Sequence, residues 1–160
     1  MGGVSLSVPI DNKNSYVKVT EGEDNDEYLI IRNDNYSPPL NIITLYGESE
    51  SRVSQEEVLD RWNRFLKDLN NIEVRKESVI IASDLNKKLG NDELGIKGNS
   101  NEISFGGYLV RELIASGKYV FANNSNKTEG GPETRIDPAD ESKKSVLDVI
   151  ILSKKSGEEH

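Results

Sequence analysis

The stretch SVIIASDLNKKLG, residues 78–90, decides the fold that we expect for this chain. Its apolar residues from Val79 to Ala82 run without interruption between polar flanks, which is typical of a strand buried on both faces of a sheet. Asp84 and Asn86 follow at the end of this strand. In an open α/β sheet, functional groups gather beyond the carboxyl ends of the strands, where a carboxylate and an amide could hold water, a metal ion or a phosphate oxygen. Both residue types also cap turns, and taken alone the pattern slightly favours that simpler role.

The bulk composition limits the classes of protein to which the chain can belong. Its 160 residues suffice for one domain with a core, which we assign to residues 1–153, followed by a polar tail at 154–160. The net charge of −8 argues against tight, non-specific binding to nucleic acid, which depends on Lys and Arg. The chain has no cysteine, which excludes disulfides and thiolate metal sites and fits an intracellular protein. No apolar run reaches membrane-spanning length, and the only histidine is His160 at the C-terminus.

Short apolar runs before this stretch predict an antiparallel meander. Period-two alternation and β-rich composition predict four strands at residues 3–9, 16–19, 28–31 and 40–46, joined by short polar turns. A helix is then expected from Ser54 to Leu69, because its apolar residues recur every three or four positions. Ser54 and Glu57 form a capping box at its start, and Asn70-Asn71 would end it. We assign Trp62 to the core.

The second half of the chain predicts one more helix and two more strands. The helix covers Gly106–Ala115 with Gly117 as its C-cap, and a short strand covers Tyr119–Ala122. Polar, glycine-containing loops are expected at 91–104 and at Asn123–Gly131, and a second loop, rich in charge, is expected after Thr134-Arg135.

The last strand is expected at Ser145–Leu152, with Asp148 in its middle. A carboxylate within an apolar strand is costly unless it is paired or hydrogen-bonded. It could orient a catalytic or DNA-contacting group, or it could satisfy the amides of a neighbouring loop. The cost favours a functional site. We expect Asp148 and Asp84 to lie together beside Asn86 at one rim of a shared sheet.

The order of these features resembles the endonuclease/exonuclease/phosphatase superfamily, whose members have the DNase I-like fold. Within it, the chain is most similar to the endonuclease domains that precede reverse transcriptases in non-LTR retrotransposons. The resemblance covers roughly the whole chain, and its most specific parts are the Asp-x-Asn strand end and the Leu-Asp-x-Ile strand, in that order. The full set of matching features is Tyr46, Arg61-Trp62, Ser83-Asp84-Leu85-Asn86, Gly106-Gly107-Tyr108-Leu109, Thr134-Arg135 and SVLDVI at 145–150.

This resemblance implies a partial two-sheet α/β sandwich that hydrolyses phosphodiester bonds in DNA with Mg²⁺ or Mn²⁺. It matches Tyr46 to the tyrosine that abuts the scissile phosphate, and Asp84 to the aspartate that positions or deprotonates the attacking water. It matches Asn86 to the asparagine that binds phosphate or metal-bound water, and Asp148 to the aspartate that orients the catalytic histidine. Such a site stabilises the charge that develops at phosphorus while a carboxylate aims the water.

Thr134 and Arg135 match positions that often contact DNA in the family. The chain also departs from the family pattern. The strands that carry the metal-binding Glu would precede Gly3, and the final Ser-Asp-His has no match, because His160 lies in a polar tail. The usual glycine before Asp-x-Asn is Ser83. We therefore expect the central portion of the domain, truncated at both ends, in which Asp84 and Asn86 alone make a poor Mg²⁺ site.

Three hypotheses for the function rank in this order. The chain is a truncated or degenerate endonuclease with weak or no activity alone; or it is a non-enzymatic module that binds protein or nucleic acid; or a second chain completes the site. Missing strands would leave exposed sheet edges, which tend to pair, so a homo-oligomer is expected. DNA is the expected partner and the membrane is not, and the location would be intracellular, with the nucleus compatible with the resemblance.

Overall fold

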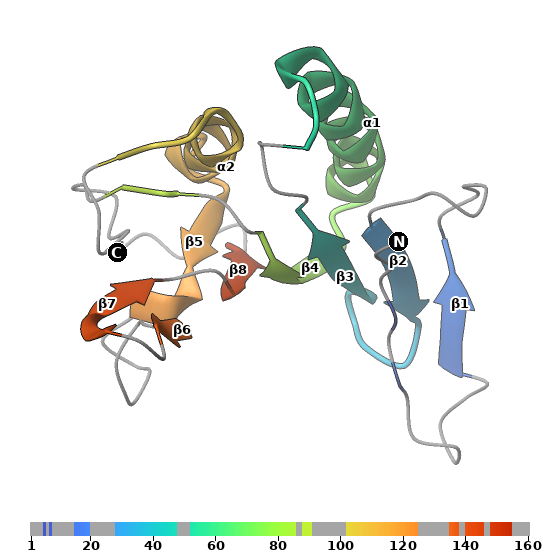
Figure 1. Cartoon of the computed structure of the whole chain (residues 1–160). Coiled ribbons are helices and arrows are strands. Elements are labelled where there is room, and N and C mark those ends of the chain that lie inside the picture. The colour runs from blue at the N-terminus through green and yellow to red at the C-terminus, as the bar shows by residue number, and fades with distance from the viewer. Residues whose placement is uncertain are drawn as a thin grey trace.

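A mixed six-stranded sheet carries both helices of the described chain on one face (Figure 1). The computed structural model describes residues 5, 7, 15–19, 28–47, 52–85, 88–90, 102–124, 135–137, 140–145 and 148–154, with the backbone alone at 124, 135–137 and 140–145. The elements are β1 (Tyr16–Lys18), β2 (Tyr28–Asn33), β3 (Leu40–Tyr46), α1 (Gln55–Val74), β4 (Ser78–Asp84), α2 (Phe105–Ala115), β5 (Tyr119–Phe121), a 3₁₀ turn η2 (Ala122–Asn124), β6 (Arg135–Asp137), β7 (Asp140–Ser145) and β8 (Asp148–Ser153).

The strand order β1-β2-β3-β4-β8-β5 joins a meander to a crossover. Strands β1, β2 and β3 pair antiparallel, as the sequence predicted for the runs at 16–19, 28–31 and 40–46. The next pair, β3 and β4, is parallel, because α1 carries the chain back across the sheet between them. Strand β8 then inserts antiparallel between β4 and β5. Most of the strand expected at residues 3–9 lies outside the described residues.

The core lies between the sheet and the helices. Along β4 the odd-numbered residues Val79, Ile81 and Ser83 are buried, and the even-numbered ones are only half-buried. The expectation that this strand is buried on both faces was therefore wrong: in the described chain, helices cover one face alone. Phe65 and Leu69 of α1 and Val110 of α2 are almost fully buried against this helix-covered face. Burial of such side chains contributes about 1.5–3 kcal/mol each.

Helix α1 begins with the predicted capping box. The Ser54 hydroxyl accepts a hydrogen bond from the Glu57 amide at 3.2 Å, and the Glu57 carboxylate accepts one from the Ser54 amide at 2.9 Å. The helix continues through Asn70-Asn71 to Val74, so the predicted end was one turn too early. Ile72 is 1% exposed and extends the apolar face of the helix, and this packing outweighs the weak helix propensity of the two asparagines.

The C-terminal third differs from the prediction in two places. Residues 135–137 and 140–145 form the two-stranded sheet β6–β7 where a charged loop was expected. Strand β8 begins at Asp148 rather than at Ser145, which belongs to β7. These two strands are polar and pair through backbone hydrogen bonds. Their sequence therefore shows no apolar alternation from which a strand could be predicted. In the described residues, no helix is long and apolar enough to cross a membrane.

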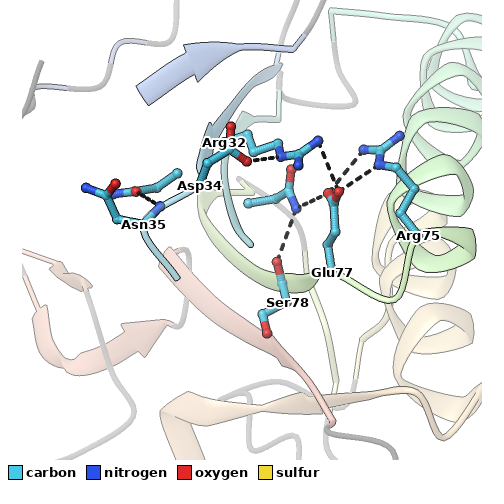
Figure 2. A network of polar contacts seen from close by, with 8 residues as sticks. Arg32, Asp34, Asn35, Arg75, Glu77 and Ser78 are labelled. Carbon is cyan, nitrogen blue, oxygen red and sulfur yellow. Dashed lines mark hydrogen bonds and ion pairs between the residues drawn. The ribbon is translucent and has the colours of Figure 1, made fainter. Parts of the chain in front are cut away.

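A buried polar network anchors the far end of α1 to the sheet (Figure 2). The side chain of Glu77 is 4% exposed, and its carboxylate accepts hydrogen bonds from the Arg75 guanidinium at 2.9 and 3.2 Å and from Asn41 Nδ2 at 2.9 Å. Arg32 approaches it from β2 at 3.1 Å and also pairs with Asp34 at 2.6 Å. Burial alone would raise the pKa of Glu77, but these hydrogen bonds and the charges of Arg75 and Arg32 hold that pKa below its usual value.

Candidate catalytic rim

Three of the predicted site residues lie in one row across three neighbouring strands. Tyr46 at the end of β3 pairs with Asp84 at the end of β4, and Asp84 pairs with Asp148 at the start of β8. Residues that are direct partners in a sheet present their side chains on the same face. We call Tyr46, Asp84 and Asp148 the acidic rim. By the alternation of β4, the two aspartates lie on the face opposite the helices, at the edge where the parallel strands end.

The two aspartates form the closer of the two kinds of antiparallel pair. The carbonyl of Asp148 and the amide of Ile150 both point away from β4, because both are hydrogen-bonded by Asn123 on the other side of β8. The carbonyl of Asp84 points toward β3, where it accepts a hydrogen bond from the Gly47 amide at 2.8 Å. Asp84 and Asp148 are thus a non-hydrogen-bonded pair, for which Cα atoms lie about 4.5 Å apart and side chains approach closely.

Contacts at the ends of β3 and β4 fix this geometry. The Ser83 hydroxyl donates a 2.6 Å hydrogen bond to the carbonyl of Leu45. The backbone of Gly47 passes so close to Leu85 that a Cβ on Gly47 would lie 2.0 Å from the Leu85 carbonyl oxygen. Glycine is required here because no other residue leaves room for the two strand ends to meet. The small residue before Asp84 and the glycine after Tyr46 therefore lock the register of the rim.

The loop after the rim is tied to the start of α2. Ser104 caps α2 by accepting from the Gly107 amide at 3.2 Å, and its own amide donates to the carbonyl of Lys88 at 2.9 Å. A Cβ on Gly107 would lie 2.1 Å from that same carbonyl. The helix start and the segment that follows β4 are thus held in contact.

Other predicted site residues are placed differently or not described. Asn86 and Thr134 lie outside the described residues, and Arg135 is described only as backbone at the start of β6. Asp148 is the first residue of β8 and is exposed, rather than buried in the middle of the strand. The predicted cost of burying its carboxylate therefore does not arise, and the case for Asp148 now depends on its position opposite Asp84.

The described side chains do not by themselves form a complete divalent-metal site. Within the described ranges, no cluster of three or more His, Asp or Glu residues has the geometry to hold a metal ion. The acidic rim offers two carboxylates, whereas Mg²⁺ prefers six oxygen ligands in octahedral geometry.

A small apolar cavity of about 60 Å³ lies on the helix-covered side of the rim. It is lined by Leu45, Tyr46, Trp62, Leu85 and Leu109, among others, so it borders the tyrosine of the rim but neither aspartate. Trp62 packs against Phe65 with ring centroids 5.2 Å apart, so its assignment to the core agrees with the structure. The cavity is large enough for water, and its lining is mainly apolar apart from Arg61 and the two tyrosines Tyr28 and Tyr46.

One residue beside the rim was missed by the sequence analysis. Asn123 was assigned to a polar loop, but it lies in η2 and its side chain binds the backbone of β8 at Asp148 and Ile150. Its only sequence signal is its place directly after a short apolar strand.

Comparison with known proteins supplies the fold. No family model matches the chain, and no curated protein matches it by sequence. The human Nocturnin catalytic domain with bound sulfate matches with a TM-score of 0.50 and 12% identity, over 89% of this chain and 49% of that chain. The chain has part of the DNase I-like fold. The endonuclease domain of TRAS1, a telomere-specific non-LTR retrotransposon, matches with a TM-score of 0.49 and 14% identity, over 80% of this chain and 51% of that one. The chain thus spans about half the length of these DNase I-like structures.

Proposed function

We propose that the chain carries the central part of a metal-dependent endonuclease site, which cleaves DNA phosphodiester bonds slowly when these residues act alone. The observation that carries the proposal is the direct pairing of Asp84 with both Tyr46 and Asp148 on one face of the sheet. The DNase I-like fold and the resemblance of the strand-end motifs support it. Half-buried Asp84, rather than exposed Asp148, is the better candidate for work on the substrate.

Each rim residue has a chemical role in this proposal. The carboxylate of Asp84 accepts a proton from the attacking water and aims it at phosphorus. The hydroxyl of Tyr46 donates a hydrogen bond to a non-bridging phosphate oxygen, where negative charge increases in the transition state. Asp148 lies on β8 directly opposite Asp84 and places a second carboxylate beside it. Mg²⁺ or Mn²⁺, when bound with substrate phosphate, supplies further charge stabilisation.

Slow cleavage follows from the number of ligands that the described residues contribute. Two rim carboxylates leave most of the coordination sphere of a divalent ion to water and to the substrate. Binding of DNA is also expected to be weak and to fall steeply with salt, because a chain of net charge −8 neutralises few phosphates. Residues 134 and 135 remain proposed DNA contacts.

Plasmid nicking tests the proposal. Wild-type protein should nick supercoiled DNA slowly with Mg²⁺ or Mn²⁺ and not with EDTA, and Asp84→Ala should abolish the reaction. Asp60→Ala is the matched control, because Asp60 is an exposed aspartate on α1 away from the rim. Nicking by the Asp84→Ala variant, or no nicking by wild-type protein at any concentration, would reject the proposed endonuclease activity. The chain would then be a binding module on the same fold.

We also propose that the chain self-associates through its sheet edges. Strands β1 and β5 are the outer strands of the described sheet, and each is three residues long. The outer edge of a sheet presents backbone N–H and C=O groups that can pair with a strand of another chain. Light scattering after size exclusion should show a dimer or larger species, and a monomer at high concentration would reject this part of the proposal.

A further inference from the structure

Strand β5 is shorter than its neighbour β8 and, among the residues that the structure describes, leaves the first residues of β8 without a strand partner on that side. The β5–β8 pairing covers Tyr119–Phe121 against residues 151–153, so β8 extends beyond it from Ile150 back to Asp148. At that point the chain after β5 turns into η2 and can no longer offer a strand edge. The carbonyl of Asp148 and the amide of Ile150 face this side and need other partners.

The side chain of Asn123 supplies both partners. Its Nδ2 donates a 2.9 Å hydrogen bond to the carbonyl of Asp148, and its Oδ1 accepts a 2.7 Å hydrogen bond from the amide of Ile150. A carboxamide carries the same donor and acceptor as a peptide group. Asn123 therefore replaces the missing stretch of β5 with one side chain, and an aspartate or an alanine there could not make both bonds.

The residues that Asn123 holds are those that pair with β4 at the rim. On their other side, Asp148 pairs with Asp84 and Ile150 with Ala82. Asp148 is the first residue of β8, and the ends of strands open more readily than their interiors, so separation from β4 is easiest there. The two hydrogen bonds from Asn123 oppose that separation.

We propose that Asn123 is a positioning residue that holds Asp148 opposite Asp84. The consequence for cleavage rests on the proposed function, whereas the consequence for strand pairing does not. Loss of the two Asn123 hydrogen bonds should let the start of β8 move away from β4, while the helices and the rest of the sheet keep their packing. A misplacement of about 1 Å in a catalytic site can lower a rate by roughly a hundredfold.

Nuclear magnetic resonance tests the positioning without any need for activity. In wild-type protein the α protons of Asp84 and Asp148 should show a strong Overhauser contact, as expected for a non-hydrogen-bonded pair. Asn123→Ala should remove this contact and speed hydrogen exchange at the Ile150 amide about tenfold or more, by a loss of about 1.4 kcal/mol in local opening free energy. Asn123→Asp keeps an acceptor for Ile150, so it should protect that amide and still lose the contact.

Matched controls and a second readout separate positioning from general stability. Asn63→Ala and Asn63→Asp make the same changes at an exposed site on α1 and should leave the contact unchanged. If the chain nicks DNA, Asn123→Ala should lower the rate at saturating DNA about tenfold to a hundredfold and leave the half-saturating DNA concentration within about twofold. An unchanged Asp84–Asp148 contact in folded Asn123→Ala and Asn123→Asp would overturn the inference. The absence of nicking in wild-type protein would overturn the proposed function alone.

Discussion

Gly47 and Leu85 touch through their backbones at the point where β3 and β4 end. A Cβ on Gly47 would lie 2.0 Å from the carbonyl oxygen of Leu85, and the Gly47 amide binds the carbonyl of Asp84 at 2.8 Å. This backbone contact therefore holds Gly47, the residue after Tyr46, against Leu85, the residue after Asp84. Because the neighbouring atoms are backbone, no rotation of a side chain can make room for a larger residue.

The substitution Gly47→Ala should destabilise the protein and disturb the rim. Overpacking of this kind costs about 1–3 kcal/mol in the free energy of unfolding, which urea denaturation measures. The control is Gly117→Ala, where φ is +76° and nothing lies within 4 Å of the added Cβ. It should cost about 1–2 kcal/mol through backbone strain alone. Resonances of Asp84 and Leu85 should shift only in Gly47→Ala, and equal shifts in both variants would contradict the steric argument.

Neutralising Asp148 should stabilise the fold. Asp148 and Asp84 are direct partners across β4 and β8, and removing a like-charge pair should raise the free energy of unfolding by about 0.2–1 kcal/mol. The gain from Asp148→Asn should be largest at low ionic strength and shrink in salt, where the repulsion is screened. Asp60→Asn, on the exposed side of α1, should show no such gain. Destabilisation by Asp148→Asn would show that the carboxylate makes contacts that outweigh the repulsion.

The sequence predicted those elements whose apolar pattern has a definite period. The strand Leu40–Tyr46 has the predicted limits, and α1 has the predicted capping box, because alternation, three-to-four spacing and the Ser54–Glu57 pair are local signals. The meeting of Asp84 and Asp148 was also expected, from the order of the motifs. Their functional roles remain predictions.

Other features depend on contacts that no local pattern encodes. The sequence predicts a strand at Ser145–Leu152, but β8 begins at Asp148, where the side chain of Asn123, far away in sequence, binds the first backbone groups of the strand. The β6–β7 pair carries no apolar alternation. The second face of β4 is half-buried where the sequence predicts full burial, since a run of isoleucine and valine looks the same in either environment.

The phenol of Tyr119 should make the protein sensitive to alkali. Burial raises the pKa of Tyr119, and its 2.7 Å hydrogen bond to Glu73 and the charge of Glu73 raise it further. A group whose folded pKa is raised contributes stability below its unfolded pKa, about 10, and loses it as pH rises above that value. Tyr119→Phe should cost about 1.5–3 kcal/mol at pH 8 and lose this alkaline dependence. The difference in ultraviolet absorbance between wild-type protein and Tyr119→Phe should show that Tyr119 ionises only when the protein unfolds. Ionisation of Tyr119 near pH 10 in the folded protein would contradict the raised pKa.

The network around Glu77 should set part of the acid sensitivity of the fold. The pKa of Glu77 lies below its usual value, because hydrogen bonds and the charges of Arg75 and Arg32 outweigh its burial. A group with a lowered folded pKa contributes stability above its unfolded pKa, about 4.3, and loses it as pH falls toward the folded value. Glu77→Gln should therefore lower the free energy of unfolding by about 3 kcal/mol at pH 7. This is the lower end of the range for breaking a buried ion pair, because the side chains of Arg75 and Arg32 are 40% and 31% exposed.

The pH dependence of that cost distinguishes charge from packing. The difference between wild-type protein and Glu77→Gln should shrink as pH falls below about 4.3, because protonation removes the same charge from wild-type protein. Denaturation in urea between pH 7 and 3 measures this difference, and Glu112→Gln on the exposed side of α2 provides a matched control that should follow wild-type protein throughout. A cost that stays constant with pH would mean that Glu77 acts through the shape of its side chain and not through the ion pairs that join α1 to β2.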